Sequence, residues 1–147
     1  MDRIAADGIT LAFNPDGGVI DDLVIEPAGG TPLRPLHKAP WVRDGEALPD
    51  HVAPVERRLA GDFFCAPFGG GSAEVPIHGW AANGTWESQG ANTAAGGTVT
   101  ATYRLRCHNR FCLRGRRRTT DCPLLCRSTR FLFVRRNGNT GLLCLQI

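Results

Sequence analysis

The sequence predicts an all-β fold, part of an antiparallel β-sandwich. Short alternations of apolar and polar residues recur at the length of strands, and clusters of turn-forming residues separate them. No segment shows the apolar spacing of an amphipathic helix. The chain has 147 residues, of which 42% are hydrophobic, and this composition suffices for the core of one domain.

The first part of the chain predicts a hairpin. Ile9, Leu11 and Phe13 alternate with less apolar residues, which is typical of a half-buried strand. Residues 14–18, Asn-Pro-Asp-Gly-Gly, favour a turn, and residues 19–26 resume as a second strand.

The middle of the chain is less regular. Residues 27–56 contain six prolines and few periodic positions, so we expect irregular crossing loops there. Residues 59–68 predict a strand that ends at a glycine turn over 69–71. Residues 85–90 and 98–105 predict a final strand pair, joined by a turn. The apolar residues of the last strand share one face: Val99, Ala101, Tyr103 and Leu105.

Composition changes abruptly near residue 105. Residues 1–105 contain 7 Lys and Arg against 13 Asp and Glu, a net charge of −6, whereas residues 106–147 contain 10 Arg against one Asp, a net charge of +9. Five of the six cysteines lie in the second part, which lacks Ala, Glu, Lys, Met, Trp and Tyr. This change predicts a boundary, with a strand region before it and an anomalous Cys/Arg-rich tail after it.

Two interpretations of the tail stay open. An out-of-frame translation of a GC-rich gene gives Arg, Cys, Leu, Ser and Pro, as in this tail, and residues 106–130 show no strand or helix period. The alternative is a small basic module. Residues 131–134 and 141–145 flank Asn137-Gly138, which predicts a hairpin.

A basic module would suggest zinc or nucleic acid as its ligand. Cys107, Cys112, Cys122 and Cys126, with His108 nearby, could supply zinc ligands, but neither pair has the tight C-x2-C spacing. Its arginines could neutralise phosphates, but no aromatic residues are interleaved for base stacking, so a solvated run is favoured and nucleic acid is not expected as a partner. The arginines concerned are Arg114, Arg116, Arg117 and Arg118.

One motif resembles a known family. Residues 76–81, Pro-Ile-His-Gly-Trp-Ala, followed by Asn83 and Trp86, resemble the His-Gly-aromatic motif of the aldose 1-epimerase (galactose mutarotase) family. Residues 61–69 resemble the preceding strand in one bacterial branch of that family, and the resemblance extends over about 8–105. It implies the N-terminal portion of a large galactose mutarotase-like β-sandwich.

The resemblance implies carbohydrate metabolism with a hexose as ligand, and no metal, nucleotide or organic cofactor. Family members interconvert hexose anomers with a histidine acid and a glutamate base, both downstream of the motif. Here only His108 follows His78, and no glutamate follows Glu87, so we expect a truncated, inactive isomerase or a non-catalytic carbohydrate-binding fragment. No catalytic residue is assigned.

The substrate-binding candidates are His78 and Trp80. His78 matches the motif histidine that contacts sugar hydroxyls, the alternative being a histidine bonded to backbone beside a turn. Trp80 matches the motif's aromatic position, the alternative being a core tryptophan. The family often has an Asn-Arg pair where this chain has residues 68–71, Phe-Gly-Gly-Gly, which suggests a divergent branch.

Other features carry weaker expectations. Asp21 and Asp22 are adjacent, so in a regular strand they face opposite ways and cannot act as a pair. Cys65 is expected to be a small buried apolar residue, and His37 and His51 have no ligand spacing around them.

The remaining expectations concern location and association. No apolar run is long enough to span a membrane and no secretory signal is visible, so we expect a cytoplasmic protein without a membrane partner. An incomplete sandwich would leave strand edges unpaired and an apolar face uncovered, so we also expect self-association.

Overall fold

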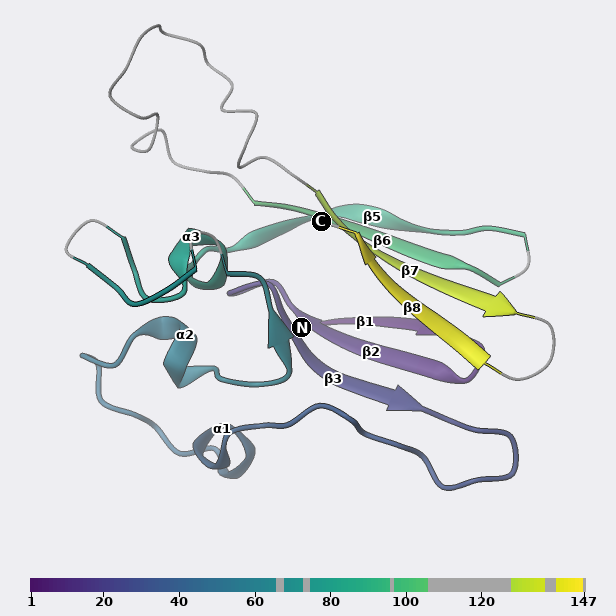
Figure 1. Cartoon of the computed structure of the whole chain (residues 1–147), viewed down its shortest axis with the longest axis horizontal. Coiled ribbons are helices and arrows are strands. Elements are labelled where there is room, and N and C mark those ends of the chain that lie inside the picture. The colour runs from purple at the N-terminus through teal and green to yellow at the C-terminus, as the bar shows by residue number, and fades with distance from the viewer. Residues whose placement is uncertain (66–67, 73–74, 96, 106–127, 137–139, 147) are drawn as a thin grey trace, which may run out of the picture.

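The structure, a computed structural model, describes all residues except 66–67, 73–74, 96, 106–127, 137–139 and 147. The described strands form two four-stranded sheets, in the orders β1-β2-β3-β4 and β5-β6-β7-β8, with antiparallel neighbours throughout. The sheets lie as two layers, and three short helices lie toward one end of them (Figure 1). The mostly-β antiparallel fold predicted from the sequence is therefore confirmed.

The first sheet contains the predicted hairpin and one strand that the pattern analysis missed. Its strands are β1 (Asp2–Ala6), β2 (Ile9–Asn14), β3 (Val19–Ile25) and β4 (Asp62–Phe63). The side chains of β2 alternate between buried and half-buried, as predicted. Strand β1 pairs with β2 across an Asp-Gly turn, a strong hairpin signal in the sequence.

The strand predicted over residues 59–68 is wrong in extent, because only Asp62–Phe63 pair with β3. Ala60 instead forms a bridge with Lys38, and the Gly61 N–H donates to the His37 carbonyl at 2.7 Å. Gly61 also has φ +53°, which a regular strand does not accommodate. The backbone therefore departs from the strand conformation at Gly61. Residues 60 and 61 pair instead with residues 37 and 38, in the segment that follows β3.

The crossing segment between β3 and β4 contains two single-turn helices in addition to the predicted loops. Helices α1 (Pro40–Asp44) and α2 (Pro54–Arg57) each begin with proline, whose fixed φ suits the first helical position. The Trp41 Nε1–H donates to the Glu56 carbonyl at 3.0 Å and joins the two helices. Within the part of the chain that the structure describes, no helix has the length and apolarity needed to cross a membrane.

The second sheet is built from both sides of the composition change. Its strands are β5 (Trp86–Thr93), β6 (Val99–Leu105), β7 (Ser128–Arg136) and β8 (Thr140–Gln146). The β7–β8 backbone pairing confirms the strands of the hairpin predicted near the C-terminus, while its turn, residues 137–139, lies outside the described residues. Strand β7 also pairs with β6, which places it in the same sheet.

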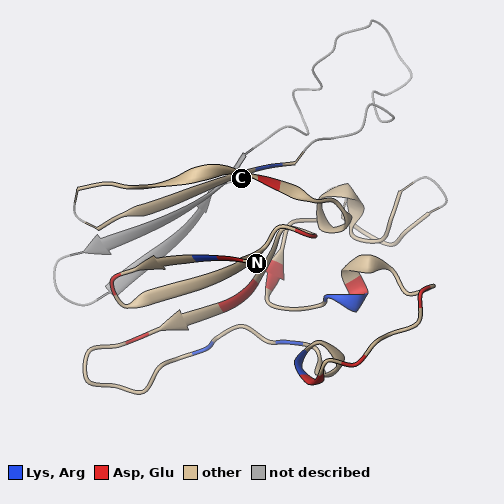
Figure 2. Cartoon of the chain, turned by 180° about the vertical axis from the view of Figure 1, so that it is seen from behind, with Lys and Arg blue, Asp and Glu red and all other residues tan. Residues whose placement is uncertain are grey.

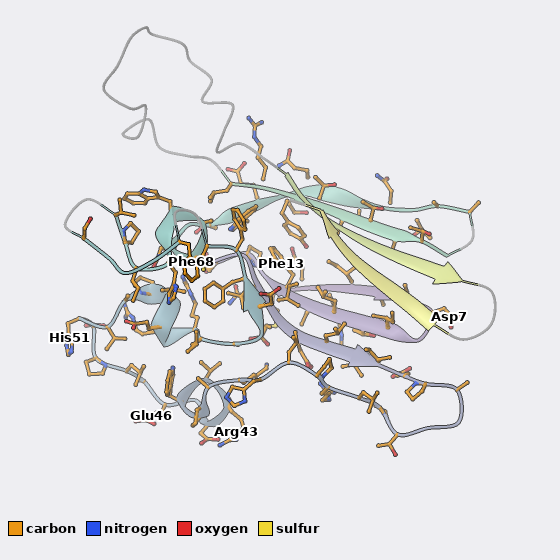
Figure 3. All side chains as sticks on the ribbon, viewed as in Figure 1. Asp7, Phe13, Arg43, Glu46, His51 and Phe68 are labelled. Carbon is orange, nitrogen blue, oxygen red and sulfur yellow. The ribbon has the colours of Figure 1, made fainter. Side chains whose placement is uncertain are left out.

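The core lies between the two sheets. The predicted inward face of β6 is confirmed, since Ala101, Tyr103 and Leu105 are buried. The ring centroids of Phe13 and Tyr103 lie 4.1 Å apart, and Phe13 points between the layers (Figure 3). The Tyr103 hydroxyl donates to Asp2 Oδ2 at 2.8 Å and so links β6 to β1. The buried cluster comprises Ile4, Ile9, Leu11, Phe13, Ile20, Leu23, Ala81, Trp86, Ala101, Tyr103 and Leu105.

The turn between β2 and β3 docks onto the segment that leads into β5. The Gly17 N–H donates to the Gly84 carbonyl at 2.8 Å, and the Trp86 N–H donates to the Pro15 carbonyl at 2.9 Å. The Trp86 side chain is 5% exposed and lies against Gly18, where a Cβ atom would be 2.4 Å from its Nε1. Only glycine leaves room for the indole at this position.

Gly18→Ala is therefore expected to destabilise the fold by about 3 kcal/mol or more, since the added methyl overpacks against Trp86 and sits at positive φ. Gly29→Ala is the matched control, because Gly29 also has positive φ but has nothing within 4 Å of its Cβ position. The control should cost only about 1 kcal/mol. Urea unfolding measures both, and equal losses would contradict the packing explanation.

Tyr103→Phe is expected to lower the free energy of unfolding by about 1–2 kcal/mol at neutral pH, because it removes the hydrogen bond to Asp2. Burial, and then Asp2, raise the pKa of the Tyr103 phenol above its usual 10.0. The unfolded chain therefore loses this proton at lower pH than the folded protein, and stability should fall as the pH rises above about 10.

Tyr103 is the only tyrosine in the sequence, so tyrosinate absorbance reports on it directly. The folded protein should form tyrosinate only at higher pH than the urea-unfolded chain, and Tyr103→Phe should remove this component of the alkaline loss of stability. Coincident titrations of the folded and unfolded states would rule out the proposed environment.

Candidate functional site

The candidate site begins at a tight turn at His78. This residue has φ +61°, and among the described residues it is the only non-glycine with positive φ. The Gly79 N–H donates to the Pro76 carbonyl at 2.9 Å, and the His78 N–H donates to the Gly69 carbonyl at 3.0 Å. Helix α3 (Gly79–Asn83) follows at once, so His78 forms the entry to this helix. The His-Gly pair of the motif is thus a bend between the glycine loop and α3.

The side chain of Asn83 closes this turn from the other end of α3. Its Nδ2 donates to the Ile77 carbonyl at 2.7 Å and to the Gly79 carbonyl at 2.8 Å. These carbonyls lie one residue before and one residue after His78. The backbone on both sides of the histidine is therefore bonded to a single carboxamide.

The His78 imidazole is half-buried. Its ring meets the Phe63 ring edge-on, with centroids 5.5 Å apart and an interplanar angle of 78°. Its Nδ1 is buried and has no hydrogen-bond partner. The ring is therefore not hydrogen-bonded to the backbone through this nitrogen. Nε2 is then the ring nitrogen that remains for a ligand.

The two candidate residues lie close in the chain but differ in environment. Trp80, in α3, is 40% exposed, whereas the motif's second tryptophan, Trp86, is 5% exposed and donates from Nε1 to the Ala81 carbonyl at 3.0 Å. The core tryptophan of this motif is therefore Trp86. Trp80 therefore exposes aromatic surface that an approaching molecule can contact.

Phe68 is a residue that the sequence analysis did not assign to the site. It is 87% exposed and precedes Gly69, whose carbonyl binds the His78 N–H. Figure 3 shows it at the same end of the molecule as α2 and α3. An aromatic residue beside a run of glycines was the available signal. His51, in contrast, lies on the outer loop between α1 and α2, away from this turn (Figure 3).

Cys65 follows β4 and is half-buried, where the sequence predicted a buried residue. Burial raises the pKa of the Cys65 thiol, and the Asp62 carboxylate raises it further. The thiolate, which is the nucleophilic form, is therefore disfavoured at neutral pH. Cys65 is thus poorly suited to nucleophilic chemistry.

The prediction that Asp21 and Asp22 face opposite ways is wrong. The β2–β3 register shifts between Ala12 and Phe13, and this irregularity lets both carboxylates line one cavity of about 320 Å³ on the first sheet. Each is paired with the crossing segment, Asp21 with Lys38 and Asp22 with Arg34. These pairs fasten the crossing segment to the sheet.

Metal binding by the tail lies outside what the structure describes, because the candidate cysteines fall within residues 106–127. Among the described residues, no group of three or more His, Cys, Asp or Glu side chains is arranged to hold a metal ion.

In comparisons with known proteins, no family model, no curated protein and no solved structure matches this chain. A function for the chain is therefore inferred from the geometry around His78 and from the resemblance of its motif.

The positive φ of His78 leads to a stability prediction. His78→Gly should be more stable than His78→Ala by about 1 kcal/mol, because glycine adopts this conformation without strain and alanine does not. The same two substitutions at Asn92, an exposed position in β5, provide the control. There glycine should be the less stable variant, and urea unfolding that gave the same order at both positions would contradict the backbone assignment.

Proposed function

We propose that this chain is the sugar-contacting, N-terminal portion of an aldose 1-epimerase-like protein. Its two sheets would form part of a galactose mutarotase-like sandwich. His78 would bind a hexose hydroxyl through Nε2, and Trp80 would stack on the apolar face of the ring. No metal or cofactor is needed for either contact.

The observation that carries this proposal is the surroundings of Trp80. A tryptophan that is 40% exposed lies two residues from a histidine with one nitrogen free of the backbone. Helix α3 carries no charged residue, while charges gather on β3, α1, α2 and their loops (Figure 2). A sugar ring presents apolar C–H faces and hydroxyl groups, and an exposed tryptophan two residues from an imidazole offers groups for both.

The proposal covers binding rather than catalysis. Anomer exchange needs an acid for the ring oxygen and a base for the anomeric hydroxyl, on opposite sides of the ring. The family's acid and base follow the motif in sequence, and here Glu87 is the last glutamate and His108 the only later histidine. We therefore expect the 147-residue chain to bind a hexose without accelerating mutarotation.

A zinc or nucleic-acid module in the tail remains an alternative. It concerns residues outside the described part, and no contact or charge cluster on the described surface favours it.

Self-association also remains a proposal. Among the described strands, β1 pairs only with β2, so its other edge would be available to a strand of another copy.

Titration of the 147-residue protein with D-glucose and D-galactose tests the proposal. Binding with about millimolar affinity is expected, and Trp80→Ala should weaken it about tenfold, which corresponds to losing about 1.4 kcal/mol of stacking. Leu33→Ala is the matched control, since Leu33 is also an exposed apolar residue but lies in the crossing segment. Equal affinities for both variants, or no binding of either sugar, would refute the proposal.

A further inference from the structure

The conformation of His78 needs an explanation because it is strained. A side chain at φ +61° brings Cβ close to the backbone, and histidine gains nothing locally that glycine would not provide. Gly79, the next residue, also has positive φ, at +78°, so two successive residues depart from ordinary backbone conformations. Such a pair persists only where surrounding contacts fix it.

Asn83 provides those contacts. Both of its Nδ2 hydrogens are used, one on the Ile77 carbonyl and one on the Gly79 carbonyl. The two peptide units flanking His78 are thereby held, and with them the direction of its Cα–Cβ bond. The Ile77 bond reaches outside α3, so it does more than cap the helix.

The orientation of the carboxamide follows from its partners. Two carbonyl oxygens require two N–H donors, which places Nδ2 toward the turn and Oδ1 on the opposite side. Oδ1 is buried there without a hydrogen-bond partner. Leaving a buried oxygen unpaired is unfavourable, so the orientation is maintained by the two bonds to the turn. Aspartate could not replace asparagine, because its carboxylate oxygens would face the Ile77 and Gly79 carbonyl oxygens without a hydrogen between them.

We propose that Asn83 is a positioning residue that holds His78 with Nδ1 buried and Nε2 directed to the ligand. The role in ligand binding rests on the proposed function, since the ligand is the hexose named there. The role in fixing the turn does not. Asn83 acts on His78 through its hydrogen bonds to the two backbone carbonyls.

The first test is a double-mutant cycle on stability. Asn83→Ala should lower the urea unfolding midpoint, and this loss should be larger when residue 78 is glycine, because a strained histidine turn relaxes once the two bonds are removed whereas a glycine turn has no strain to release. A residue that only ends α3 would give the same loss in both backgrounds. Additive effects of His78→Gly and Asn83→Ala would therefore overturn the proposal.

The second test measures the ligand and the imidazole separately. Asn83→Ala should weaken D-glucose binding at least about fivefold and shift the His78 ring resonances in the NMR spectrum of the free protein. Asn92→Ala, at an exposed asparagine of β5, should change neither. Unchanged His78 resonances in folded Asn83→Ala protein would overturn the positioning role.

The two tests separate the two proposals. If the unsubstituted chain binds no hexose, the sugar function fails, while the double-mutant cycle and the ring resonances still decide the role of Asn83. If the chain binds hexose and Asn83→Ala binds it equally well, the sugar function stands and the positioning role fails.

Discussion

The packing of Trp86 against Gly18 is the contact on which the rest of the structure depends. The indole fills the space above the β2–β3 turn and bonds back to the Ala81 carbonyl, so one side chain joins the first sheet, α3 and the start of β5. Backbone bonds from Gly17 and to Pro15 secure the same junction. Because the junction joins segments about 70 residues apart, it fixes how the second sheet approaches the first.

The site is a consequence of this junction. Helix α3 has only five residues, too few to be stable alone, and three of them, Gly79, Ala81 and Ala82, are buried. Its position is set by packing at one end and by the bend at His78 at the other. Trp80 then lies on the outer side of a helix whose inner side is occupied. Support for the aromatic surface thus comes from the core rather than from the loop around it.

The sequence predicted the strands whose side chains alternate and failed where the backbone departs from a regular strand. Ile9 to Phe13 and Val99 to Leu105 follow a strict two-residue period, and both strands are confirmed. The strand over residues 59–68 was wrong because the positive φ of Gly61 is set by a tertiary contact with His37. The shared cavity of Asp21 and Asp22 depends on a register irregularity that residue alternation does not reveal.

The site shows the same division between local pattern and tertiary context. The motif indicated which residues to consider, His78 and Trp80. It did not indicate that Trp80 would be exposed and Trp86 buried, because burial depends on how α3 packs in the folded chain. Nor did it indicate that Asn83 bonds across His78, since that contact requires α3 to turn back on the loop. Glycine would fit position 78 with less strain, as it does at position 79. A histidine there is therefore less stable than a glycine would be, and this strain supports the proposed role of the turn in binding.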